Sequence, residues 1–433
     1  MRTLVLSDAE TDEPKRSDPS NSATVWAVFL AAVMLALAMP AAEAVRRLFY
    51  PPKRLLPEAG AWLSSGFSFG LEMLPTVGIA VLAATWIFVF WSLIGSFLNV
   101  VVHRLPLGQS VILGGSHCPR CSSPIKWHDN LPVVGWLRLH GRCRSCDLPI
   151  SARYPVVESV CAGLGTAVYF RELLSGGINL PGRVPDLLHD GMLRLIPNAG
   201  PDLIGLYAYH CFALCMLLAW GLIAYDGHRL PGRSVLLVLF VAAGLPLVFP
   251  SLHPLPLGLA TSAAGGLAGL LSGTVLSSVF HRLLRGDAAG RSGLPLVLPR
   301  QLSLGLVLVG IVFGWQGMLG TAVLLLGLCL IQILVWSSSL QWPTLPVELL
   351  LVPAAFIHLY LWRQLVVSLG VWWPGPAPTA ACLVIPAALL VVVTLALMAI
   401  TPAHGRQPTA SKPSRTDPSP SLETNSNESP HRC

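Results

Sequence analysis

Long apolar stretches separated by short polar segments run along most of this chain. The first covers residues 24–44, and later ones are close to the length that a helix needs to cross a bilayer. The later stretches lie at about 76–100, 155–170, 203–225, 234–249, 256–280, 302–336, 346–366 and 381–400. The 302–336 stretch is long enough for two passes joined by a tight turn near Gly314 or Gly320. The pattern predicts an all-α polytopic membrane protein with about nine or ten spans.

Composition supports a membrane location. Of the 433 residues, 53% are apolar and 11% are charged, and the mean hydropathy is +0.65. A soluble domain carries about 25% charged residues, so this chain cannot cover itself with a solvated surface. The net charge of +7 comes without a basic run interleaved with aromatic residues. We therefore expect a bilayer as partner and no nucleic acid.

The distribution of basic residues predicts the orientation. Lysine and arginine exceed the acids in 103–154 and in 281–300, whereas acids exceed them in 171–202. Threading the spans in order places 103–154, 226–233 and 281–300 on one side, which the positive-inside rule assigns to the cytoplasm. The basic residues between 46 and 54 would then face outward, so the orientation of the first helix stays open.

Two close cysteine pairs lie in the central polar block. Cys118 and Cys121 form one C-x-x-C, and Cys143 and Cys146 form the second. Two such turns supply four thiolates for a tetrahedral Zn²⁺ site, which can organise a block too small for its own core. A redox pair or two disulfides are the alternatives, and a reducing cytoplasm argues against stable disulfides. We predict a structural zinc ion in a cytoplasmic, zinc-ribbon-like insert.

The residues around these cysteines resemble a known family. The runs GSFLNVVVHRLP and NLPVVGWL, the two cysteine pairs and RYPVVES closely resemble the N-terminal half of type IV prepilin peptidases, over about residues 95–160. The resemblance implies a multi-pass enzyme of the bacterial inner membrane. It implies an aspartic endopeptidase that removes leader peptides from prepilins or pseudopilins at the cytoplasmic face, with S-adenosylmethionine as methyl donor for the new N-terminus in many members.

Aspartic peptidases need two carboxyl groups that share a proton. Asp226 closes an apolar run and precedes GHRLPGR, as the first catalytic aspartate of the family does, so it is our candidate catalytic residue. The alternative is an interfacial acid that pairs with Arg229 or Arg233. A carboxylate near the end of a membrane helix is costly, which favours a functional role.

The second aspartate of the family falls on Leu302 here. Counting back from Gly314-Trp315-Gln316 gives this position, and the G-x-G-D glycines are missing as well. Asp287 lies in the preceding loop and is the only candidate substitute on the cytoplasmic side; the alternative is a solvated loop acid with no catalytic role. Asp202 should lie at the far end of the Asp226 helix, and Glu348 begins a later span after a long apolar stretch. The competing hypothesis is a catalytically inactive pseudopeptidase that still binds pilin-like proteins.

We divide the chain by composition and resemblance. The expected regions are 1–75 with a polar N-terminus and an extra helix, 76–170 with the zinc insert, 171–336 as the peptidase-like membrane domain, 337–401 with additional helices, and 402–433 as a disordered tail.

Overall fold

The computed structural model describes residues 62–118, 120–183, 201–253, 258–284, 301–337, 345–376 and 378–400. The predicted first span at 24–44 and the predicted tail at 402–433 lie outside these residues. The described residues form helices and no strand, which confirms the all-α prediction.

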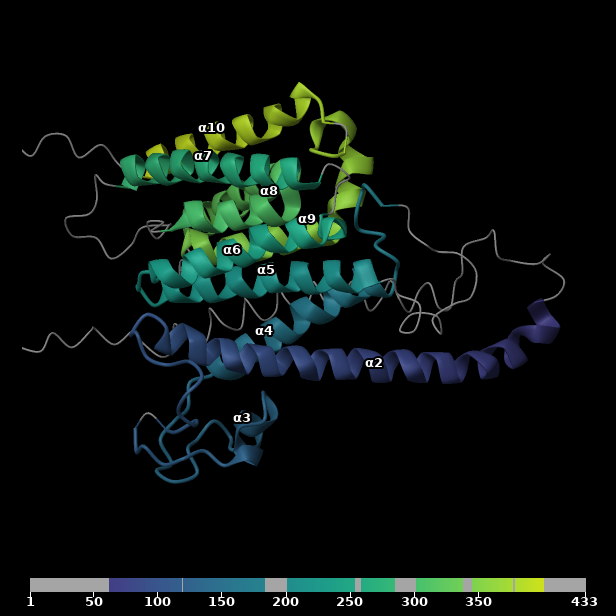
Figure 1. The fold of residues 1–433 in the computed structure, drawn as a ribbon, viewed down its shortest axis with the longest axis vertical. Coiled ribbons are helices and arrows are strands. Elements are labelled where there is room, and N and C mark those ends of the chain that lie inside the picture. Colours follow the sequence, from purple (N-terminus) through teal and green to yellow (C-terminus); the bar gives the residue numbers. More distant parts are fainter. Residues whose placement is uncertain are drawn as a thin grey trace, which may run out of the picture.

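A bundle of roughly parallel helices makes up most of the described chain (Figure 1). Its members are α2 (Trp62–Arg104), α4 (Arg153–Val168), α5 (Pro201–Tyr225), α6 (Gly232–Val248), α7 (Gly258–Leu284), α8 (Leu302–Ser337), α9 (Val347–Leu369) and α10 (Val384–Ile400). Segments of α2, α5, α7, α8 and α9 are long and apolar enough to cross a membrane. The stretches predicted at 155–170, 234–249 and 381–400 form helices of only 16 or 17 residues. The described part is thus a multi-pass membrane protein with fewer full-length spans than its apolar pattern predicts.

Helix α8 reverses direction at Gly314. A straight helix of its 36 residues would be about 54 Å long. Yet Gln301 at its start bonds to Glu348, and Gln332 near its end bonds to Leu345, only three residues away from Glu348. Gly314 adopts a φ of 74°, which favours glycine because it has no Cβ. The two arms, 302–313 and 315–337, therefore run in opposite directions. The first arm is only about 18 Å long, so it is too short to be the full pass that the sequence predicted.

Glycines let α7 pack closely on the first arm of α8. Gly265, Gly269 and Gly273 recur at every fourth position and face Gly310, Leu306 and Ser303 respectively. A Cβ at Gly269 would lie 2.3 Å from the carbonyl oxygen of Leu306. Small residues at this spacing allow helix backbones to approach in a membrane. This contact fixes the position of the residues that begin α8.

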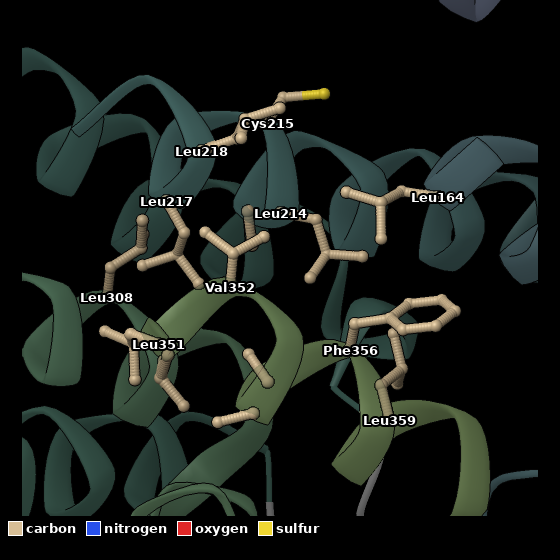
Figure 2. Packing of buried hydrophobic residues seen from close by; sticks show 14 of the residues in the cluster. Leu164, Leu214, Cys215, Leu217, Leu218, Leu308, Leu351, Val352, Phe356 and Leu359 are labelled. Atoms are coloured by element: carbon tan, nitrogen blue, oxygen red, sulfur yellow. The ribbon is translucent and has the colours of Figure 1, made fainter. Parts of the chain in front are cut away.

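The core lies between α4, α5, α8 and α9. Figure 2 shows Leu217 of α5, Leu308 of α8 and Leu351 of α9 converging, and each is at most 1% exposed. Large apolar side chains also cover the outside of the bundle, including Phe240 of α6, which is 76% exposed. An apolar exterior over an apolar core is expected of a protein solvated by lipid.

Candidate functional site

Residues 105–152 form an insert between α2 and α4, at the end of the bundle where α2 stops (Figure 1). The insert contains two short helices, η2 (Trp127–Asp129) and α3 (Val134–Arg138). Its two cysteine turns have the same backbone pattern. The N–H of Ser122 bonds to the carbonyl of Cys118, and the N–H of Asp147 bonds to the carbonyl of Cys143, each at 2.9 Å.

The four thiols meet at one point. Their Sγ atoms all lie within 4.8 Å of one another, with 3.9 Å between Cys118 and Cys146 and 4.0 Å between Cys121 and Cys143. Tetrahedral zinc with Zn–S bonds of about 2.3 Å requires sulfur atoms about 3.8 Å apart. The donor set and its spacing therefore fit a zinc ion, and the structure brings together the four cysteines that the sequence pattern singled out.

Thiol pKa values in this cluster are spread widely. Hydrogen bonds from Ser123 lower the pKa of Cys121 to about 6, and backbone N–H groups of Cys146 and Ser145 lower that of Cys143. The pKa of Cys146 is raised to about 12, because burial and the neighbouring thiols outweigh the backbone hydrogen bond at Leu148 that lowers it. Thiolates this close repel one another, so a divalent cation would stabilise the cluster.

An ion pair crosses the insert. The Nε and Nη2 atoms of Arg144 donate to the two carboxylate oxygens of Asp129, each at 2.6 Å, and Asp129 is buried. The Arg144 guanidinium holds the pKa of this carboxyl below its ordinary value. Arg142 likewise pairs with Asp147. Arg142 and Arg144, on either side of Cys143, thus pair with carboxylates, and the sequence analysis did not predict these two ion pairs.

A buried glutamate of α4 fastens the insert to the bundle. The backbone N–H of Val133 donates to Glu158 Oε2 at 2.7 Å. Val133 has a φ of 60°, an outlier for a β-branched residue, so the surrounding contacts impose this conformation. Glu158 also packs on Gly95 of α2, where a Cβ would lie 2.8 Å from its Cα. The insert is therefore bonded to α4 at the place where α4 packs on α2.

Asp226 lies directly after α5 and is held by Arg153, the first residue of α4. The two guanidinium Nη atoms donate to its carboxylate oxygens at 2.5 and 2.8 Å, and both side chains are about one-quarter exposed. The suggested partners Arg229 and Arg233 were wrong, because the ion pair joins residues 73 positions apart. This pair links the helix that follows the insert to the end of α5.

Gln301 connects the turn after Asp226 with Glu348, and Leu302 is the next residue in the chain. Gln301 Oε1 accepts a hydrogen bond from the N–H of Leu230 at 3.1 Å, four residues after Asp226. The N–H of Gln301 donates to Glu348 Oε1 at 2.9 Å. Leu302, where the family places its second aspartate, follows Gln301 and is fully buried.

Dismissing Glu348 as a distant acid was therefore wrong. The reversal at Gly314 and the start of α9 return the chain to the Asp226 end. A glutamate at the start of an apolar helix was the available sequence signal, since such acids are costly there.

The other two candidate acids are Asp202 and Asp287. Asp202 begins α5 and pairs with Arg183, so it lies at the opposite end of the helix from Asp226, as predicted. Asp287 lies outside the described residues.

A second polar cluster lies within the bundle, far from Asp226. His210 Nδ1 and Glu172 Oε1 are 2.7 Å apart, and Asn179 donates to the same oxygen. His210 precedes Asp226 by 16 residues, or about 24 Å along α5. This cluster joins α5 to the short helix η3 (Tyr169–Leu173) that follows α4, and it is separate from the candidate site.

Comparisons with known proteins find similarity around the insert and beyond it. The profile of the bacterial Peptidase A24 N-terminal domain matches residues 89–172, which cover the end of α2, the insert and α4. The prepilin leader peptidase/N-methyltransferase of Myxococcus xanthus is 51% identical over 77 residues, 18% of this chain and 23% of that protein. The type 4 prepilin-like proteins leader peptide-processing enzyme of Escherichia coli is 43% identical over 88 residues, 16% of this chain and 33% of that protein. No solved structure matches.

A longer match extends beyond the insert. The prepilin leader peptidase/N-methyltransferase of Klebsiella pneumoniae is 32% identical over 236 residues, 53% of this chain and 85% of that protein. This match covers far more of the chain than residues 89–172 and most of the length of the relative, so this chain belongs to the prepilin leader peptidase family.

Proposed function

We propose that this protein is a membrane-embedded aspartic endopeptidase that removes leader peptides from type IV prepilin-like proteins. The reaction would take place at the cytoplasmic face of a bacterial inner membrane, the side that the basic residues of the insert favour. Family membership supports the substrate class, because the relatives are named for prepilin leader peptides.

The position of Asp226 carries the proposal. It is a partly exposed carboxylate at the end of a helix long enough to cross the membrane, held by both Nη atoms of Arg153. A leader peptide with its cleavage site near the bilayer surface would meet this end of the bundle. A carboxylate there can take a proton from water as the water attacks the peptide carbonyl.

Zinc has a structural role in this proposal. Cys118, Cys121, Cys143 and Cys146 would hold one Zn²⁺, which closes the coordination sphere and leaves no position for substrate. The metal would fix the fold of the insert, and Glu158 would then hold the insert against α4. The N-methyltransferase in the names of the relatives makes S-adenosylmethionine the expected methyl donor, and methyl transfer rests on this resemblance alone.

Leu302 supports the second candidate, an inactive pseudopeptidase that binds pilin-like proteins without cleaving them. A fully buried leucine stands where the family has its second aspartate. An isolated carboxylate lacks the acid that protonates the carbonyl oxygen, a contribution worth about 10²–10⁴ in rate.

Complementation separates these two functions. The chain is expressed with a prepilin in a bacterium that lacks its own prepilin peptidase, and pilin size is followed by immunoblot. We expect mature pilin with the wild-type protein and uncleaved prepilin with Asp226→Asn. Asp202→Asn is the matched control, because Asp202 is also paired with an arginine but lies at the other end of α5. Uncleaved prepilin that copurifies with the wild-type protein would instead support the pseudopeptidase.

A further inference from the structure

Because the G-x-G-D aspartate is missing, the proposed site lacks the second carboxyl group that the reaction needs. Aspartic hydrolysis uses one ionised carboxyl to activate water and one protonated carboxyl to polarise the carbonyl. Asp226 can be only one of them. The described bundle helices place two other carboxyl groups toward this end, Glu158 of α4 and Glu348 of α9.

Glu158 is committed to the insert. Its Oε2 accepts the N–H of Val133, and its backbone packs against Gly95 of α2. It therefore lies at the junction of α2, α4 and the insert, where it holds the insert in place.

Glu348 lies beside the position of the lost aspartate. Its Oε1 accepts the backbone N–H of Gln301, the residue immediately before Leu302. The Gln301 side chain in turn accepts the N–H of Leu230, within the turn that follows Asp226. Gln301 thus connects Glu348 with the backbone of the turn that follows Asp226.

Packing against α5 places Glu348 near the same end of that helix. A Cβ at Gly221 would lie 2.9 Å from the Cα of Leu349 and 3.2 Å from the carbonyl oxygen of Glu348. Gly221 precedes Asp226 by five residues, or about 7.5 Å along the helix. Glu348 is 7% exposed, and burying a carboxyl in a membrane helix carries a cost that function can justify.

From these contacts we propose that Glu348 supplies the second carboxyl group of the site in place of the aspartate replaced by Leu302. The inference rests on the proposed peptidase function. Arg153 donates two hydrogen bonds to the carboxylate oxygens of Asp226. We therefore assign the water-activating role to Asp226 and the proton-donating role to Glu348.

The two carboxyl groups exchange protons with the substrate and water so that no net proton is gained or lost by the enzyme. Asp226 removes a proton from water while the water oxygen bonds to the peptide carbon, and the Glu348 carboxyl gives its proton to the carbonyl oxygen. When the tetrahedral intermediate collapses, the C–N bond breaks, Asp226 passes its proton to the leaving nitrogen, and Glu348 recovers its own. One water is consumed, and both carboxyl groups return to their starting state.

Cleavage of a purified prepilin by the full-length protein in lipid tests the proposal. We expect Glu348→Gln to lower kcat by about 10²-fold or more, because the acid is lost, with little change in KM. Adding Leu302→Asp to Glu348→Gln restores a carboxyl at the family position and should recover about 10-fold or more of the lost rate, within the 10²–10⁴ that an acid supplies. A purely structural role for Glu348 would not predict rescue by a second buried acid.

Three outcomes are distinguishable. Cleavage by Glu348→Gln at the wild-type rate, with Asp226→Asn inactive, overturns the role of Glu348 and leaves the peptidase function standing. A wild-type protein that does not cleave overturns both. If Glu348→Gln does not fold, Glu348→Asp carries the test, because it keeps the carboxyl but withdraws it by one methylene. A loss of about 10-fold or more at unchanged stability then supports the role, and an unchanged rate overturns it.

Discussion

The glycine contact between α7 and α8 offers a direct test of the packing that positions the site. A Cβ at Gly269 would lie 2.3 Å from the Leu306 carbonyl oxygen, whereas ordinary contact begins near 3.4 Å. Gly269→Ala therefore requires the helices to separate by about 1 Å, and a gap of that size forfeits a quarter to a half of the dispersion energy of each contact. Overpacking of this kind costs about 1–3 kcal/mol.

Gly327→Ala is the matched control. Gly327 lies inside the second arm of α8, and a Cβ there would meet nothing within 4 Å. Both variants gain about 0.5–1 kcal/mol because alanine favours the helix over glycine. The difference between their free energies of unfolding therefore isolates the contact, and we expect Gly269→Ala to be less stable by about 1–3 kcal/mol. Equilibrium unfolding in mixed micelles measures both, and equal stabilities would refute the close packing of α7 on α8.

Three further outcomes follow from the insert and the ion pairs. Metal analysis should find about one zinc ion per chain in the wild type and far less in Cys143→Ser. Cys382→Ser is the control and should keep its zinc, because the Cys382 thiol is buried outside the insert. Equal zinc contents in the two variants would contradict the site. Because Arg144 lowers the pKa of Asp129, their ion pair should stabilise the insert above about pH 4, and this stabilisation should be lost as the pH falls through the lowered pKa. The free energies of unfolding of the wild type and Asp129→Asn should therefore converge at low pH. A difference that stays constant with pH would contradict this. Arg153→Met removes two charge-assisted hydrogen bonds worth about 1.5–3 kcal/mol each, so cleavage should fall by about 10-fold or more, and an unchanged rate would show that this arginine does not position the acid.

Local patterns in the sequence predicted the local parts of this structure. Bilayer-length apolar stretches indicate helices because a lipid-exposed backbone must satisfy its own hydrogen bonds. The two residues between the cysteines of each pair indicate a metal-binding turn, because a turn of this length brings both thiols to one side. The four thiols do lie together in the structure. The turn at Gly314 was predictable because only a glycine takes its φ without strain.

Contacts between distant segments were not predictable in the same way. Arg153 and Asp226 are 73 residues apart, and nothing in the residues near Asp226 distinguishes Arg153 from Arg229. Glu348 looked remote because a long apolar stretch separates it from Asp226. The hairpin in α8 brings the chain back to the same end, so distance along the sequence gave the wrong estimate of distance in space.

Identification of the cleavage product tests whether this protein removes leader peptides with Asp226 as a catalytic residue. Purified wild-type protein and its Asp226→Asn variant are incubated in lipid with a purified prepilin, and the product is analysed by mass spectrometry. We expect a single cut that separates the leader from the mature pilin with the wild-type protein and no cut with Asp226→Asn. Cleavage at the same bond by Asp226→Asn would contradict the assignment of the site.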